Sequence, residues 1–371
     1  MAHSDNVPVH PPRDAVVAVT SRCNAHCVMC SVWKHPQSDA LQPEHMRKLP
    51  PSLASVNLSG GEPFLRDDLE QFVRQVRQRC RRARITISTN GYLADRIVDR
   101  VESMLEIDPA LRLAVSLDGL GAVHDAVRGD AGAYERVIRL LDLLQGRGFR
   151  GLRLSMTLGH VNARQLPAVA ELARTRGLEL GVVAAHRCRT HMRSDQQPDP
   201  SADQHVREDF QQVLAQWLRS WRPRQWLRAH FAAGTYRYMA RQSQSLHCGA
   251  GGNFFFLQAD GTVYSCGSDG RAMGNLIEQE WDGLWNSPAA RQARALSHAC
   301  GRNCWMVCTV RSWYRRNLWS VVGWALGSKL LAHLRLFRLG GPAKAQAGHA
   351  PGQTQDEQAS IEAPVRADPS H

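Results

Sequence analysis

The stretch AVVAVTSRCNAHCVMCS, residues 15–31, joins an apolar run to three cysteines with the spacing C-x3-C-x2-C. AVVAVT has the composition of a buried strand, which places Cys23, Cys27 and Cys30 on the loop after it. Zinc needs a fourth ligand, for which His26 is available. A [4Fe–4S] cluster on three thiolates leaves one iron without a protein ligand. A disulfide with a spare thiol is the third alternative.

The start of the chain and its composition bear on these alternatives. Residues 1–14 lack the basic and apolar regions of a secretory signal, and no apolar run reaches the length of a spanning helix. We therefore expect a soluble cytoplasmic protein, in which structural disulfides are rare. The chain nevertheless has ten cysteines, and five of them gather in its last third: Cys248, Cys266, Cys300, Cys304 and Cys308.

Short β-type runs alternate with helical patterns from residue 15 to residue 185. The predicted strands are residues 15–20, 55–59, 84–89, 111–117, 152–158 and 178–185. Amphipathic stretches at 67–80, 94–106, 134–147 and 162–176 separate most of them. This alternation predicts an α/β fold with a parallel sheet, a partial (β/α)6 TIM-type barrel whose site lies on the loops after the strands.

A second motif, SGGEP at residues 59–63, follows the second predicted strand. Its two glycines permit positive φ and close approach of the backbone to a ligand, and Glu62 offers a carboxylate for a cation. Together with SGGEP, the cysteine loop resembles that of the radical S-adenosylmethionine (SAM) superfamily.

That resemblance implies a [4Fe–4S] cluster on Cys23, Cys27 and Cys30, with SAM on the open iron. An electron passed to SAM then releases a 5′-deoxyadenosyl radical, which abstracts a hydrogen atom from the substrate. A small donor such as flavodoxin or ferredoxin supplies the electron, and His26 becomes a bystander. The residues implied in SAM binding are Met29, Gly60, Gly61, Glu62, Ser88, Asn90, Ser116 and Arg128.

Two further loops resemble those of superfamily members with auxiliary clusters. In SLDGLGAVHDAVRG, residues 116–129, Asp118 is expected to face the site. His124 and Asp125 fit a polar cap at a helix start better than a ligand role. Asn162 suits a helix cap and a ligand equally well.

The second cysteine group resembles the SPASM and twitch extensions of the same superfamily. ADGTVYSC, residues 259–266, predicts a hairpin that turns at Asp260-Gly261. The resemblance implies one auxiliary [4Fe–4S] cluster. Five cysteines compete for its four places, and the final C-x3-C-x3-C spacing departs from the usual pattern. Zinc on four of these thiols remains the alternative.

The net charge of +12 comes mainly from the C-terminal segment, since residues 283–355 contain ten Lys or Arg and no Asp or Glu. Residues 311–338 are rich in Trp and Leu. They fit a helix packed on the protein, or a peripheral helix lying in an anionic membrane surface.

The predicted organisation therefore has five parts. They are a flexible N-terminus (1–13), a radical SAM core (14–240), an auxiliary cluster domain (241–310), a basic amphipathic helix (311–339) and a disordered tail (340–371).

The implied activity is that of a radical SAM oxidoreductase or maturase acting on a peptide, sugar or lipid-type substrate. Cys188, just after the last barrel strand, is the candidate radical-quenching residue. The alternatives are a non-catalytic iron–sulfur or zinc protein and an RNA-modifying radical SAM enzyme. Nucleic acid is disfavoured because the barrel is near charge balance and no RNA-binding module is identifiable.

Overall fold

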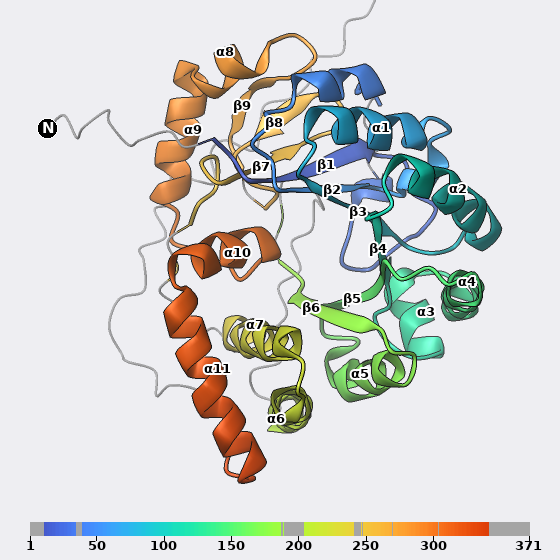
Figure 1. Ribbon diagram of the computed structural model, residues 1–371, viewed down its shortest axis with the longest axis vertical. Coiled ribbons are helices and arrows are strands. Elements are labelled where there is room, and N and C mark those ends of the chain that lie inside the picture. Colours follow the sequence, from blue (N-terminus) through green and yellow to red (C-terminus); the bar gives the residue numbers. More distant parts are fainter. Residues whose placement is uncertain are drawn as a thin grey trace, which may run out of the picture. The chain divides into compact units, whose positions relative to one another are not determined.

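The barrel strands form one side of a nine-stranded sheet in the order β6-β5-β4-β3-β2-β1-β7-β8-β9 (Figure 1). The computed structural model describes residues 11–34, 39–186, 188, 204–240, 246, 248–268, 270–302 and 304–340. The first six strands are parallel: β1 (Asp14–Thr20), β2 (Ser55–Gly60), β3 (Arg84–Thr89), β4 (Arg112–Ser116), β5 (Leu152–Leu158) and β6 (Glu179–Ala184). The predicted partial barrel is confirmed as an open parallel sheet that does not close.

The crossover helices cover one face of these six strands. They are α1 (Leu69–Arg79), α2 (Ala94–Ile107), α3 (Ala122–Arg128), α4 (Ala133–Gly146) and α5 (Leu166–Thr175), with short 3-10 turns at Val32–Lys34, Pro43–Lys48, Pro63–Leu65 and Ala163–Gln165. In α1, Leu69, Phe72, Val73 and Val76 form the buried stripe that their helical spacing predicts.

The other face of the strands is polar and partly open. In β5, Leu152, Leu154 and Met156 are buried against the helices, while Arg153, Ser155 and Thr157 between them are only partly buried. Because side chains alternate along a strand, the second set lines the concave side of the sheet. This side offers room for ligands.

The cysteine-rich segment extends the barrel sheet. β7 (Phe254–Leu257) pairs in parallel with β1, and β8 (Thr262–Tyr264) and β9 (Ala272–Asn275) follow in antiparallel order. The predicted hairpin is confirmed, with Gly261 at φ 88° in its turn. Two helices close this region, α8 (Trp281–Trp285) and α9 (Pro288–His298).

Four helices flank the β6 edge and the C-terminal region: α6 (Gln204–Arg219), α7 (Pro223–Met239), α10 (Val307–Arg316) and α11 (Leu318–His333). α6, α7 and α11 pack on one another, as Figure 1 shows. The single helix predicted for residues 311–339 is wrong. The chain breaks at Asn317, whose side chain donates to the Trp313 carbonyl at 3.0 Å, and α10 begins at Val307.

No helix in the described ranges combines the length and apolar character needed to cross a membrane. The predicted tail at 340–371 lies outside the described residues apart from Gly340, as do residues 1–10 of the predicted N-terminus.

Candidate active site

The three cysteines of the first motif lie on the loop that leaves β1. Burial raises the pKa of Cys23 to about 11 and that of Cys30 to about 12, and the neighbouring Cys27 raises both further. Arg128 donates from Nη1 to Cys27 Sγ at 3.5 Å. The loop therefore gathers three thiols in a largely buried place beside one cation, a donor set that fits an iron–sulfur cluster.

Asp39 fixes the start of this loop. Its carboxylate accepts from Thr20 Oγ1 at 2.6 Å, from the Ser21 amide at 2.9 Å and from Arg22 Nε at 3.0 Å. Sequence reasoning missed Asp39, since a single acid outside any motif carries no signal of a loop contact.

The backbone of SGGEP supports the loop from a second side. Gly61 N donates to Thr20 O at 2.9 Å and Glu62 N donates to Arg22 O at 2.8 Å. A Cβ on Gly60 would lie 2.1 Å from Thr20 O, and one on Gly61 would lie 2.0 Å from Arg22 O. Both glycines are thus needed because the cysteine loop presses against them.

A third contact comes from the end of α3. His26 N donates to Arg128 O at 3.0 Å, and Val28 N donates to Val127 O at 2.9 Å. Gly129 has φ 66°, and a Cβ there would lie 2.5 Å from His26 O. The His26 ring packs edge-on against Trp33, with 4.8 Å between ring centroids. Three separate segments therefore hold the loop.

Glu62 is fully buried, and its carboxylate ties β2 to the end of β3. It accepts from Thr89 Oγ1 at 2.8 Å, from the Asn90 amide at 2.7 Å and from the Phe64 amide at 3.2 Å. Burial raises its pKa to about 7, against the opposing effect of these bonds. The Glu62 carboxylate, which was predicted to bind a cation, is thus largely occupied by protein hydrogen-bond donors. It holds the end of β2 against the end of β3.

The remaining predicted SAM contacts lie around the same loop. Asn90 donates to Asn24 Oδ1 at 2.7 Å, between Cys23 and Cys27 in the sequence. Ser88 bonds Asn57 Oδ1 at 3.0 Å, and Ser116 ends β4. Met29 is buried in a small apolar cluster with Tyr92, Val127 and Ala185.

Arg128 also forms a buried ion pair with Asp118, with 2.6 Å between Nη2 and Oδ2. Burial raises the pKa of Asp118, and the Arg128 cation opposes that rise. Asp118 Oδ1 accepts from the Thr157 amide at 2.7 Å, so this carboxylate links β4 to β5. Asp118, which was expected to face the site, thus positions Arg128 beside Cys27.

Of the two residues predicted to form a polar cap at a helix start, Asp125 does so and His124 does not. His124 Nδ1 accepts from the Asp118 amide at 3.0 Å. Asp125 accepts from the Gly132 and Tyr134 amides, both at 2.8 Å, and so caps the next helix, α4. Asn162 bridges loops by donating to Asp118 O at 2.7 Å and Thr157 O at 2.9 Å.

The five cysteines of the second group come together near the β7–β8 hairpin. Burial raises the pKa of Cys248 to about 11 and that of Cys304 to about 12, with Cys266 and Cys300 as contributing neighbours of both. Cys266 also lies near Cys308, in the first turn of α10. Cys266 is therefore the common neighbour, while Cys300 is exposed at the rim.

Within the described ranges, no three His, Cys, Asp or Glu side chains converge as ligands of one metal ion do. A [4Fe–4S] cluster instead places each thiolate on its own iron.

Cys188 lies between the two cysteine groups. Its Sγ donates to Gly267 O at 2.8 Å, next to Cys266, and it is close enough to Cys30 to raise that thiol's pKa. It thus faces the cysteine loop on one side and the second group on the other.

Comparison with known families agrees with this arrangement. The family described as the radical SAM superfamily matches residues 17–173, and the family described as an iron–sulfur cluster-binding SPASM domain matches residues 248–309. The chain belongs to the radical SAM superfamily. Its radical SAM and SPASM domains imply a [4Fe–4S] cluster that works with SAM and an auxiliary cluster, and the chain is an enzyme of the radical SAM maturase type.

The chain is also similar in sequence to curated proteins. The AdoMet-dependent heme synthase of Methanosarcina barkeri is 26% identical over 321 residues, covering 78% of this chain and 88% of that protein. The mycofactocin maturase MftC of Mycobacterium tuberculosis is 30% identical over 261 residues, covering 66% of this chain and 62% of that protein.

Among solved structures, Streptococcus suis SuiB bound to its precursor peptide SuiA superposes with a TM-score of 0.57. It is 15% identical, and the match covers 79% of this chain and 71% of SuiB. SuiB has also been solved bound to S-adenosylmethionine. The predicted fold of the chain is therefore confirmed.

Proposed function

We propose that the enzyme abstracts a hydrogen atom from a peptide, sugar or lipid-type substrate and passes an electron from the substrate to the auxiliary cluster. The bound cluster and SAM supply a 5′-deoxyadenosyl radical when a small reductant delivers an electron. The main support is the position of Cys188, which adjoins the cysteine loop and also the Cys266 segment. A thiol between the two cysteine groups supports the proposal that the substrate reacts between them.

The chain's own residues bind and orient the cofactor in this proposal. Cys23, Cys27 and Cys30 hold the cluster, and Gly60, Gly61 and Asp39 fix the loop that carries them. Met29 and its apolar cluster offer a surface for the adenine. Asn90 and Ser116 lie at strand ends beside the loop, where they can meet polar groups of SAM.

A peptide is the first substrate candidate. SuiB, which shares the fold, was solved with a precursor peptide, and MftC is named a maturase. The heme synthase relative makes a small-molecule substrate the second candidate. Incubation of the reduced, SAM-loaded enzyme with extracts of its own cells, followed by mass spectrometry, separates the two by the mass of the altered species. An unaltered extract despite active SAM cleavage would count against both.

Substitution of Cys266 should distinguish the contributions of the two clusters. In Cys266→Ala the iron content falls by about four atoms per chain, since a cluster holds four irons, while SAM is still cleaved. Substrate turnover is lost because the auxiliary electron acceptor is gone. Iron counting and 5′-deoxyadenosine assays check this, with Cys27→Ala as the opposite case. Full iron loading in Cys266→Ala would contradict the proposed ligand set.

The five auxiliary cysteines compete for four places, and we propose that the spare one is Cys300 or Cys308. Cys300 is exposed, and Cys308 is the member of the group that lies on α10, with Cys266 as a neighbour. One of Cys300→Ala and Cys308→Ala should therefore keep a full iron content. Loss of about four irons in both variants would exclude this assignment.

For a reaction that leaves the substrate's oxidation state unchanged, we propose instead that Cys188 gives a hydrogen atom to the substrate radical, and that an electron from the auxiliary cluster together with a proton restores the thiol. Cys188→Ser should keep the iron of both clusters and cleave SAM, yet form little product, because an alcohol O–H is a far poorer hydrogen atom donor than a thiol. Product assays with parallel iron counts test this. Normal product formation in Cys188→Ser would remove the role.

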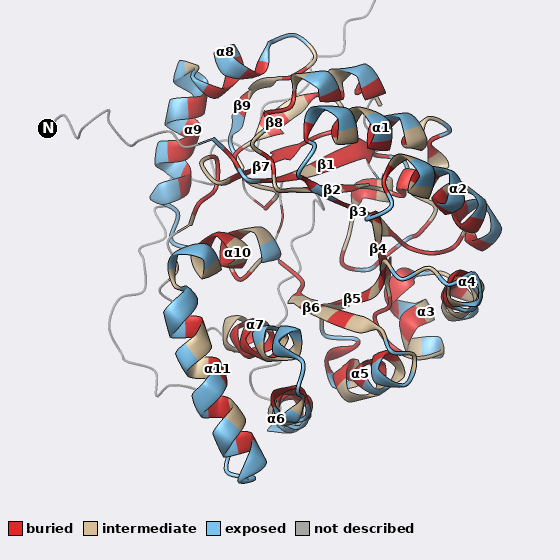
Figure 2. Ribbon diagram, in the orientation of Figure 1, coloured by how far each residue is buried: buried red, intermediate tan, exposed pale blue. Residues whose placement is uncertain are grey.

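We also propose peripheral attachment to an anionic membrane through α11. One face of this helix packs on α6 and α7 through Val321, Ala325, Ser328 and Ala332. The outward face remains exposed in Figure 2 and carries Leu318, Trp319, Leu326, Leu330, Leu331 and Leu334, each at least 43% exposed. A helix that is apolar all round, with one side uncovered, needs a further partner.

Cations surround this exposed face. Lys329 lies over the rings of Trp221 and Trp226, and Trp221 is itself 84% exposed. Arg316 precedes α11, and Arg335 and Arg338 follow it, without a nearby acid in the sequence, whereas Arg315 pairs with Asp14 at 2.8 Å. Apolar bulk ringed by cations suits the headgroup region of an anionic bilayer.

The variant Trp319→Glu/Leu330→Glu should lose flotation with vesicles of phosphatidylglycerol and phosphatidylcholine, while the parent chain floats. Leu296→Glu is the control, because Leu296 on α9 is 47% exposed and lies away from this face. Equal flotation of the double variant and the parent, or an equal loss in the control, would reject the attachment.

A further inference from the structure

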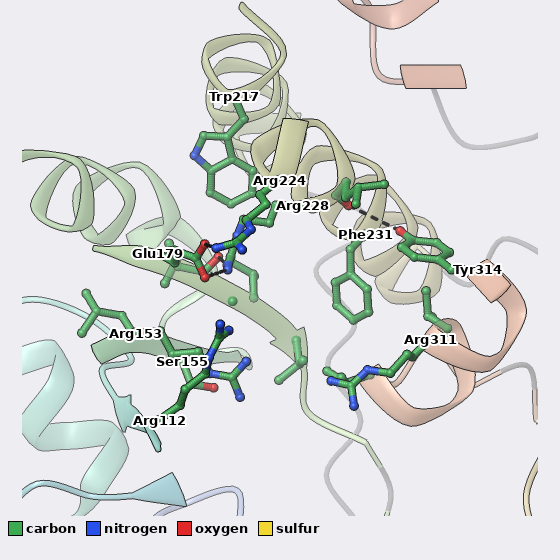
Figure 3. Close-up of a pocket in the computed structure, with 18 of the residues that line it drawn as sticks. Arg112, Arg153, Ser155, Glu179, Trp217, Arg224, Arg228, Phe231, Arg311 and Tyr314 are labelled. Carbon is green, nitrogen blue, oxygen red and sulfur yellow. Dashed lines mark hydrogen bonds and ion pairs between the residues drawn. The ribbon is translucent and has the colours of Figure 1, made fainter. Parts of the chain in front are cut away.

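A cavity of about 350 Å³ opens at the amino-terminal ends of β4, β5 and β6 (Figure 3). The cysteine loop and the other SAM-binding residues lie at the opposite, carboxyl ends of the barrel strands. Strands of five to seven residues separate these ends by roughly 15–20 Å. The cavity is therefore distinct from the SAM site, and nothing in SAM cleavage uses it.

Arginine dominates the charge of this cavity. Glu179 is the one carboxylate among its lining residues. It pairs with Arg228 at 2.5 Å and with Arg224 at 3.6 Å, and Arg311 pairs with Asp14 at 2.7 Å. Three guanidinium groups remain without an ion pair among the described residues, those of Arg84, Arg112 and Arg153.

The strand register brings these arginines together. Arg84 begins β3 and Arg112 begins β4, while Arg153 is the second residue of β5 and pairs in register with Glu179 of β6. All three stand on the concave side of the sheet, and Figure 3 shows the Arg112 and Arg153 side chains reaching into the cavity. The arginines at the starts of three parallel strands thus form one cationic layer on the sheet.

Arg153 lies at the centre of this layer without a partner. Its Nε is buried and has no hydrogen-bond partner. Burial, together with the neighbouring Arg228, Arg311 and Arg112, lowers its pKa to about 10. A largely desolvated cation among cations is costly in free energy unless an anion joins it.

The rest of the wall is apolar or small. Phe231 and Leu227 of α7 and Val310 of α10 face the cavity opposite the strands. Ser155 and Gly181, further along β5 and β6, also line the cavity. The space beside Gly181 is open, since a Cβ there would have only the Leu154 carbonyl oxygen within 4 Å. An occupant therefore meets cations on the wall made by the strands and hydrocarbon on the opposite wall.

We propose that this cavity binds an organic dicarboxylate with an apolar body, whose acidic groups pair with Arg112 and Arg153. The planar guanidinium fork of arginine suits bidentate pairing with carboxylates. The site lies outside the proposed function, so either can fail without the other.

The test is calorimetric titration of the full chain, with both clusters loaded, using decanedioate and inorganic phosphate as probes. Decanedioate should bind more tightly than phosphate because its chain contacts the apolar wall. Arg153→Gln and Arg112→Gln should each weaken decanedioate binding roughly ten-fold or more, as expected for loss of a charged hydrogen bond. Arg74→Gln, an exposed site on α1, carries the same charge change and should bind normally.

Thermal unfolding shows whether a variant that no longer binds decanedioate is still folded. Without probe, Arg153→Gln should unfold at a higher temperature than the parent, because it relieves a buried, unpaired charge, and decanedioate should no longer raise that temperature. Absence of decanedioate binding, phosphate binding of equal strength, or an equal loss in Arg74→Gln would overturn the assignment.

Discussion

Cys27→Ala should form no detectable 5′-deoxyadenosine from SAM, and its iron content should fall by about four atoms per chain. Cys27 lies at the centre of the loop, where it adjoins both other thiols and accepts a hydrogen bond from Arg128. With two thiolates left, the first cluster loses a third of its protein ligands while the second keeps all of its own.

Cys80→Ala is the matched control for this loss. Cys80 is fully buried after α1, and its Sγ donates to Pro50 O at 3.4 Å, far from either cysteine group in the fold. This variant should keep the full iron content and cleave SAM, with only a loss of stability from the small cavity it creates. Iron retention and SAM cleavage in Cys27→Ala would contradict the site described here.

Gly61→Ala should have nearly the same effect without touching a thiol. The added Cβ would lie 2.0 Å from Arg22 O and 3.0 Å from Cys23 Cβ, so the cysteine loop must move away. Overpacking of this kind costs about 1–3 kcal/mol of folding free energy. Because the loop positions the three ligands, we expect loss of about four irons and of SAM cleavage.

Gly146→Ala controls for the chemical change. Gly146 ends α4, and a Cβ there meets no heavy atom within 4 Å. Its folding free energy should stay within about 1 kcal/mol of the parent. Circular dichroism melts and iron counts on both variants check the contrast. A fully loaded, active Gly61→Ala would show that the loop does not depend on this contact.

The barrel and the first cluster site could be predicted from the sequence because their signals are local. Each strand is a short apolar run, and all six appear within about two residues of their predicted ends. The cysteine spacing and SGGEP are contiguous motifs. The sequence explained Gly60 and Gly61 by close approach of a ligand. The structure shows that they also leave room for the cysteine loop.

The features that sequence reasoning missed depend on contacts between distant residues. α7 shows no apolar stripe, because small residues such as Ala229, Ala233 and Gly234 bury it on several sides. The pairing of β7 with β1 joins segments about 240 residues apart in the sequence. Arg84, Arg112 and Arg153 are unremarkable charges in the sequence until the sheet places them side by side.

The β1–β7 pairing has a consequence for how this protein can be divided. Residues 14–17 of β1 bond β2 on one side and residues 254–257 on the other. A chain that stopped at residue 240 would expose Val17 and its neighbours as an open sheet edge, which invites pairing with other molecules. It would also strip Arg311 and Arg315 from the buried Asp14 at the start of the same strand. The auxiliary segment therefore covers the sheet edge of the catalytic half. The two halves are expected to fold, and to be inherited, as one unit.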